Sequence, residues 1–174
     1  ERSSAASQNS TLLFQGDWTK VISKKTSLNY GFKFNSRFFE NSFLYEKQKE
    51  GIYIKDGIRS NGFRYEEHIQ AAYVSISQKA RFAQLDGGLR VEATEISGGV
   101  QQQYVNLFPS LSLFHPISSS QSLSFALSSR ITRPSYKSLN PFISFADPLN
   151  LNAGNPTLKP EKAVLLELSH VKDF

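Results

Sequence analysis

The sequence predicts an all-β fold, an antiparallel up-and-down meander, and three observations support this prediction. Apolar and polar residues alternate along several segments, and no segment carries apolar residues at helical spacing. Hydrophobic residues make up only 39% of the 174 residues, whereas aromatic residues make up 13%. This composition suits strands with one apolar and one polar face better than a fold built around one dense core. It does not suit a disordered chain, because apolar side chains are too frequent.

The alternation is clearest in the second predicted strand, where Leu28, Tyr30, Phe32 and Phe34 are separated by less apolar residues. Alternate side chains of a strand point to opposite faces, so this strand has one apolar and one polar face. Residues 85–94, 110–113, 122–130 and 164–169 repeat the pattern. In chain order, the sequence predicts seven strands, at residues 11–20, 27–45, 67–79, 83–95, 105–115, 121–131 and 162–172.

One tripeptide leaves two alternatives open. Asp86-Gly87-Gly88 has the composition of a hairpin turn. The alternation of apolar and polar residues nevertheless runs through it unbroken, from Leu85 to Ala93. We therefore expect these three residues to lie inside a strand.

The predicted connections alternate strictly between short and long. They are residues 21–26, 46–66, 80–82, 96–104, 116–120 and 132–161. Bacterial outer-membrane barrels have short periplasmic turns and long extracellular loops, so the alternation favours a transmembrane β-barrel. It would place residues 46–66, 96–104 and 132–161 outside the cell, with the first strand running towards the periplasm.

Strand length supports the same prediction. Most predicted strands reach the roughly 9–11 residues that a membrane strand needs, against a mode of about 5–6 in soluble sheets. No stretch approaches the roughly 18–20 apolar residues of a membrane helix, and barrels are the other structure that can span a bilayer. The rival is a soluble all-β binding module, such as an adhesin or a carbohydrate-binding sandwich, in which the apolar faces would close into a core.

Proline is concentrated between residues 129 and 161. The segment reads Ser-Arg-Ile-Thr-Arg-Pro-Ser-Tyr-Lys-Ser-Leu-Asn-Pro-Phe from Ser129, then Ala-Asp-Pro from Ala146 and Gly-Asn-Pro-Thr-Leu-Lys-Pro-Glu from Gly154. Each proline removes a backbone donor and restricts the residue before it, so no regular strand is expected there. Gly-Asn-Pro is a turn signal. The segment therefore predicts a long, non-repetitive loop before the last strand.

This segment closely resembles the corresponding segment in the barrels of TonB-dependent receptors, particularly the Bacteroidetes outer-membrane β-barrel group. Residues 69–77, 88–94 and 107–112 also resemble that family. The resemblance is clear over residues 66–172 and weak over residues 1–60. It is specific because several separated motifs occur in the right order.

The resemblance implies a receptor in the outer membrane of a Gram-negative bacterium that takes up a ligand, such as a siderophore, cobalamin, a glycan or a peptide. It also implies contact with membrane lipid, a plug domain inside the barrel, and energy from an inner-membrane TonB complex. Plug and complex would lie outside this chain. The chain has no Met, and its strands are too few for a transporter barrel of about 22. We therefore expect residues 1–174 to be one partial barrel domain, which in isolation would self-associate through its open edges or form a partly closed sheet.

The family motif marks the candidate site residues. We favour a structural role, in which they shape the loop and anchor it to the barrel rim, over direct contact with the ligand. These residues are Arg130, Arg133, Pro134, Tyr136, Leu139, Asn140, Pro141, Phe142, Asp147, Pro148, Gly154, Asn155, Pro156, Leu158, Pro160 and Glu161. Charged residues on the polar faces should line the lumen and form cross-strand pairs, namely Arg90, Glu92, Arg130 and Glu167.

Several other classes of function are disfavoured. The chain has no Cys, which excludes disulfides, zinc–thiolate sites and thiol nucleophiles. His68, His115 and His170 lack metal-ligand spacing, and no nucleophile elbow, P-loop or Rossmann fingerprint is present. The net charge of +5 is dispersed along the chain, unlike that of a nucleic-acid-binding protein. We therefore expect a protein that is not an enzyme and needs no metal or cofactor.

Overall fold

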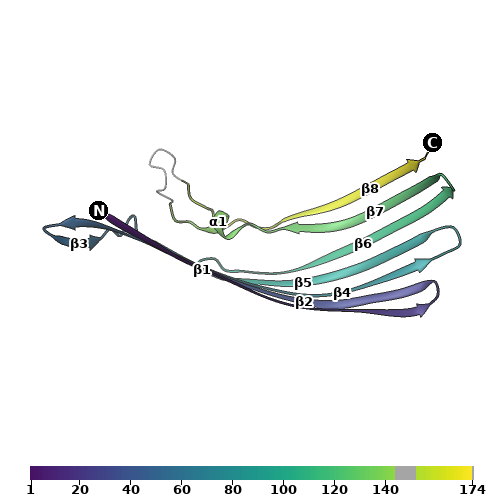
Figure 1. Ribbon diagram of the computed structural model, residues 1–174, viewed down its shortest axis with the longest axis horizontal. Helices are drawn as coiled ribbons and strands as arrows, with labels where there is room; N and C mark the ends of the chain where they lie inside the picture. The colour runs from purple at the N-terminus through teal and green to yellow at the C-terminus, as the bar shows by residue number, and fades with distance from the viewer. Residues whose placement is uncertain (144–151, 174) are drawn as a thin grey trace.

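The computed structural model describes residues 1–143 and 152–173. One antiparallel sheet contains nearly all of them, and its strands follow one another in chain order (Figure 1). The long strands are β1 (Arg2–Ser23), β2 (Thr26–Lys49), β4 (Asn61–Lys79), β5 (Gln84–Gly98), β6 (Gln102–Ser118), β7 (Gln121–Thr132) and β8 (Glu161–Lys172). The predicted all-β meander is confirmed, and each of the seven predicted strands overlaps one of these. β1 and β4 begin earlier than predicted, at Arg2 instead of residue 11 and at Asn61 instead of residue 67.

Two short elements complete the fold. β3 (Ile52–Lys55) pairs with the end of β2, and α1 (Tyr136–Leu139) is a single helical turn after β7. In Figure 1 the sheet bends around the side on which α1 lies. Among the described residues, no helix has the length and apolar character needed to cross a membrane.

The sheet is open. β1 and β8 lie at opposite ends of the strand order, and within the described residues each pairs with a neighbour on one side only. An unpaired strand edge presents a row of free N–H and C=O groups and is a template for pairing with a further strand. The described chain therefore forms a curved wall and not a closed barrel.

The strand register sorts the side chains onto two faces. Phe32, Ala72, Val91 and Leu107 lie opposite one another in a single row across β2, β4, β5 and β6. We call this the outer face. The next row towards the short turns, Tyr30, Val74, Leu89 and Pro109, is also apolar, and Leu107 is 62% exposed. Because no second sheet covers these side chains in the described structure, the apolar face does not close into a sandwich core.

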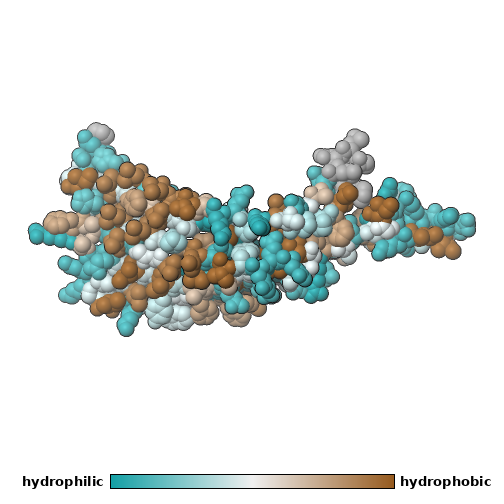
Figure 2. Space-filling view, turned by 180° about the vertical axis from the view of Figure 1, so that it is seen from behind, coloured by the Kyte–Doolittle hydropathy of each residue, from teal (hydrophilic) through white to brown (hydrophobic). Residues whose placement is uncertain are grey.

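The apolar side chains cover one half of the outer face. On β5 they occupy alternate positions from residue 85 to residue 93, close to the roughly 9–11 residues that span a membrane. Further along, the same face becomes polar, since Glu66 lies opposite Ser97 and His68 lies opposite Glu95. Figure 2 shows hydrophobic side chains gathered over the half with the short turns, with a more polar extension beyond it.

The connections differ from the predicted alternation. The short turns at residues 24–25, 80–83 and 119–120 all lie at one end of the sheet. At the other end, however, β5 and β6 are joined by residues 99–101 alone. The prediction of a long loop at 96–104 is wrong, because both strands continue past the apolar band as a regular hairpin. Only the connection between β7 and β8 is long and lacks strands of its own in the residues described.

The predicted loop at residues 46–66 is also largely strand. β2 turns back into β3 through Glu50 and Gly51, both with positive φ, 52° and 81°. Two positive φ values are characteristic of a tight two-residue hairpin turn, which usually has Asn or Asp before the Gly. Glu in that position is atypical, which explains why the turn is inconspicuous in the sequence.

The most deeply buried cluster lies on the inner face, the face opposite the apolar band. Leu139 of α1 has no exposed surface and packs among aromatic and aliphatic side chains of the polar half of the sheet. Its buried partners are Phe63, Tyr65, Ile96 and Val100. The segment after β7 therefore folds back over the inner face instead of standing away from the sheet.

Candidate functional site

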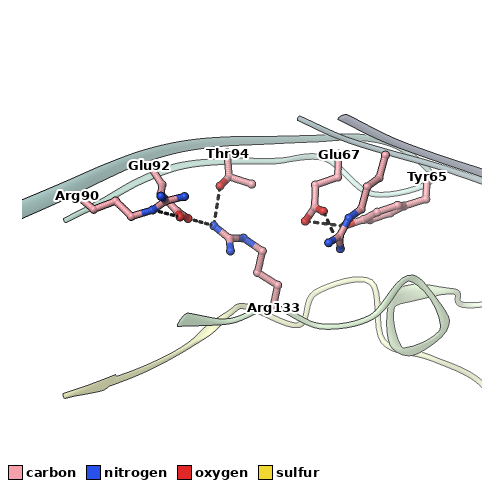
Figure 3. A network of polar contacts seen from close by, with 7 residues as sticks. Tyr65, Glu67, Arg90, Glu92, Thr94 and Arg133 are labelled. Carbon is pink, nitrogen blue, oxygen red and sulfur yellow. Dashed lines mark hydrogen bonds and ion pairs between the residues drawn. The ribbon is translucent and has the colours of Figure 1, made fainter. Parts of the chain in front are cut away.

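A carboxylate on the inner face of β5 is held between two guanidinium groups (Figure 3). Arg133 Nη2 donates to Glu92 Oε2 at 2.6 Å and to Thr94 Oγ1 at 3.1 Å. Arg90 Nε donates to Glu92 Oε1 at 2.7 Å. The side chains of Glu92 and Arg133 are only 10% and 18% exposed. Charge-assisted hydrogen bonds of this kind are stronger than neutral ones, so they fix the start of the segment after β7 onto β5.

Helix α1 attaches the same segment to β2 and β4. Ser135 caps the helix, with its Oγ accepting a hydrogen bond from the Ser138 N–H at 3.1 Å. The ring of Tyr136 stacks on Phe39 of β2, with ring centres 3.8 Å apart and planes at 28°. Leu139, three residues on, enters the buried cluster described above. One helical turn thus points an aromatic and an aliphatic side chain at the sheet.

The Gly-Asn-Pro motif packs directly on the backbone of α1. The Gly154 N–H donates to the Asn140 carbonyl, and the Asn155 N–H to the Ser138 carbonyl, each at 2.7 Å. A Cβ at residue 154 would lie 2.5 Å from the Ser138 carbonyl oxygen. Only glycine permits this approach. We call residues 133–143 and 152–160 the latch, because these contacts close the segment onto itself and onto the sheet.

The structure brings most of the predicted motif residues into the latch. Arg133, Tyr136, Leu139, Asn140, Gly154 and Asn155 make the contacts described above, and the Leu158 carbonyl accepts a hydrogen bond from Gln102. Pro134, Pro141, Pro156 and Pro160 lie in its irregular backbone, and Phe142 is exposed. Glu161 begins β8 opposite Thr132. Asp147 and Pro148 lie outside the described residues.

The predicted lumen charges are on the inner face, but their pairing differs from the prediction. Arg90 and Glu92 pair within one strand, and the second partner of Glu92 comes from the latch. Arg130 lies opposite Ala163 and Glu167 opposite Ala126, and neither forms a salt bridge within the described structure. A cross-strand pair does occur at Arg37 and Glu67, 3.6 Å apart between β2 and β4.

Sequence reasoning missed the sheet residues that receive the latch. Phe39, Phe63 and Tyr65 are aromatic residues on the inner face, as are Tyr73 and Phe108 nearer the short turns. Their presence on that face was the available signal, but nothing in the sequence links them to α1. Near Glu92, both amide atoms of Asn106 are buried and have no hydrogen-bond partner in the part of the chain described. The inner wall thus retains unsatisfied polar groups.

Towards the short turns, the inner face carries hydrogen-bonded polar side chains. The Tyr73 hydroxyl donates to Asp17 of β1, and the Ser77 hydroxyl donates to Asp86 of β5. The first pair reaches across β2, and the second joins the neighbouring strands β4 and β5. Both lie at the level of the apolar band on the outer face. One wall is thus apolar outside and hydrogen-bonded inside, as in barrels that enclose a water-filled or plugged lumen.

A family model described as the outer membrane protein beta-barrel family matches residues 1–174. The chain belongs to this family, which places it in the outer membrane, with lipid against its apolar face. None of the curated proteins and none of the solved structures compared with it matches. Fold and location are therefore set by the family and by the two-faced wall.

Proposed function

We propose that this chain is part of the barrel wall of a TonB-dependent transporter that takes up a ligand across the outer membrane. The observation that carries the proposal is the latch. Its sequence resembles the loop motif of TonB-dependent receptors, and it folds onto the inner wall at the end opposite the short turns. A latch in that position would narrow the outer mouth of a complete barrel.

The inner wall supports the proposal through its unsatisfied polar groups. Asn106 is 4% exposed, yet both of its amide atoms lack a partner in the described structure. Buried polar groups are normally hydrogen-bonded, so such groups indicate a missing partner. A plug domain inside the lumen would provide one, as would ordered water. The proposal gives the chain no catalytic role, and its ligand would be a siderophore, cobalamin, a glycan or a peptide.

Energy dependence is the property to test. In a strain lacking the full-length protein, uptake of the ligand should fall, and the intact gene should restore it. Restored uptake should stop when the TonB complex is deleted or when a protonophore collapses the inner-membrane gradient. A passive pore would continue to transport under both treatments, and that result would overturn the proposal.

A further inference from the structure

A groove separates the latch from the inner face of β1 and β2, in the polar half of the sheet. It has a volume of 890 Å³, within the range of about 300–1,000 Å³ that is typical of ligand pockets. We name it the latch groove, after its principal lining residues Phe39, Asn41, Tyr136, Asn140, Phe142 and Asn155. The Glu92–Arg133 ion pair is not part of its lining.

Three aromatic rings give the latch groove flat apolar surfaces. Phe39 and Tyr136 are stacked on each other and partly exposed. Phe142 is 42% exposed and has no packing partner among the ring contacts of the described residues. An exposed aromatic residue on a loop that is otherwise held by hydrogen bonds is not explained by the stability of the latch.

The polar lining consists mainly of side-chain amides. Asn140 Oδ1 accepts from the Phe142 N–H at 3.1 Å, and Asn155 Oδ1 accepts from the Thr157 N–H at 2.9 Å. These bonds fix both side chains and, within the described structure, leave their amide N–H groups to donate. On the opposite side, the Asn41 side chain lines the groove, with its Oδ1 turned away from solvent. The groove therefore offers side-chain amides from both of its walls.

The charge of the lining narrows the class of ligand. Among the described residues that line the groove, Lys137 is the one charged residue. A groove that binds an anionic chelate would be lined by several cationic side chains, in particular by guanidinium groups. Neutral hydroxyl groups both donate and accept hydrogen bonds, which matches a lining of side-chain amides. The C–H face of a sugar ring can lie against an aromatic ring.

We propose that the latch groove binds a neutral oligosaccharide. Phe142 and the Phe39–Tyr136 stack would contact sugar rings, and Asn41, Asn140 and Asn155 would hydrogen-bond their hydroxyls. The inference rests on the proposed function in so far as that function brings an external ligand to the outer mouth. It names the class of ligand, which the family resemblance leaves open.

Direct binding tests this inference without reference to transport. The full-length protein in detergent would be titrated with maltohexaose, xylohexaose and mannohexaose, and with tetra-alanine as a peptide probe. At least one hexasaccharide should bind, with saturation transfer from aromatic protons to its ring C–H groups. Phe142→Ala and Asn41→Ala should each weaken that binding at least tenfold. Phe114→Ala, an exposed aromatic at the short-turn end, is the matched control and should leave it unchanged.

Three results would overturn the inference. They are absence of hexasaccharide binding at millimolar concentration, binding that neither groove variant weakens, and preferential binding of tetra-alanine through the same residues. Phe142→Leu keeps an apolar side chain but removes the aromatic ring. It therefore distinguishes a loss of ring stacking from a loss of latch stability. It should unfold at the same temperature as the wild type and still weaken hexasaccharide binding about as much as Phe142→Ala does. Sugar binding without TonB-dependent uptake would refute only the transport proposal. TonB-dependent uptake without sugar binding would refute only the inference about the latch groove.

Discussion

Replacing Arg133 by Met should open the latch while leaving the sheet intact. The substitution keeps an unbranched side chain of similar length but removes the donor to Glu92 Oε2 and Thr94 Oγ1. Glu92 retains Arg90 as a partner, so the carboxylate does not become an isolated buried charge. The change therefore affects mainly the attachment of the latch to β5.

The free-energy cost of Arg133→Met can be estimated from how exposed the Glu92–Arg133 ion pair is. Breaking a fully buried ion pair costs about 3–5 kcal/mol, and hydrogen bonds to charged groups contribute about 1.5–3 kcal/mol. Because the two side chains are 10% and 18% exposed and Arg90 remains, the lower range applies. We expect about 2 kcal/mol, which at about 1.4 kcal/mol per factor of ten is roughly a thirtyfold increase in latch opening.

The opening of the latch can be measured by hydrogen exchange and mass spectrometry on the full-length protein in detergent. Peptides within residues 133–143 and 152–160 should exchange about thirtyfold faster in Arg133→Met, and peptides of β1 should not change. Arg130→Met is the matched control, because Arg130 has no salt bridge within the described structure. Adding Glu92→Gln to Arg133→Met should cost less than the sum of the two single changes. Unchanged latch exchange, or equal effects of Arg130→Met, would refute the reasoning.

Three further predictions concern the latch and the outer loops. Leu139→Ala removes a side chain with no exposed surface and should destabilise the latch by about 2–5 kcal/mol; wild-type exchange rates would contradict this. Gly154→Ala places a Cβ 2.5 Å from the Ser138 carbonyl oxygen, so limited proteolysis should cut the variant latch faster than the wild type. The hydrogen bond from Lys47, with two backbone N–H groups, lowers the pKa of Asp56 below 3.8. The ionised Asp56 therefore stabilises the loop after β3 above pH 3.8, and this stabilisation is lost as the pH falls through the lowered pKa. Hydrogen exchange in that loop should rise only below pH 3.8. Asp56→Asn should remove this pH dependence.

The strands could be predicted because each carries its own signal. Alternation along β2 and β5 reports which face meets an apolar environment, and it does so without knowledge of the neighbouring strands. The same local rule kept Asp86-Gly87-Gly88 inside β5, as observed. The proline-rich segment likewise identifies itself as irregular, because each proline removes a donor at its own position.

The candidate site could be predicted only in part, because its partners are distant in the chain. The motif marks Tyr136 and Leu139, but nothing local shows that they meet Phe39 and the cluster around Phe63. The cross-strand pairing expected for Glu92 was wrong for the same reason, since its second partner, Arg133, is 41 residues away. Strand ends were also missed where polar extensions continue past the apolar band, since a polar hairpin and a polar loop have similar composition.

The orientation of the wall is the central claim, and lipid contact at adjacent residues tests it most directly. The chain contains no Cys, so single cysteines at Leu107 on the outer face and Phe108 on the inner face can carry the same fluorophore. In the full-length protein reconstituted into vesicles, nitroxide-labelled lipid should quench the label at residue 107 strongly and the label at residue 108 weakly. Equal quenching at the two positions, or stronger quenching at residue 108, would contradict the account.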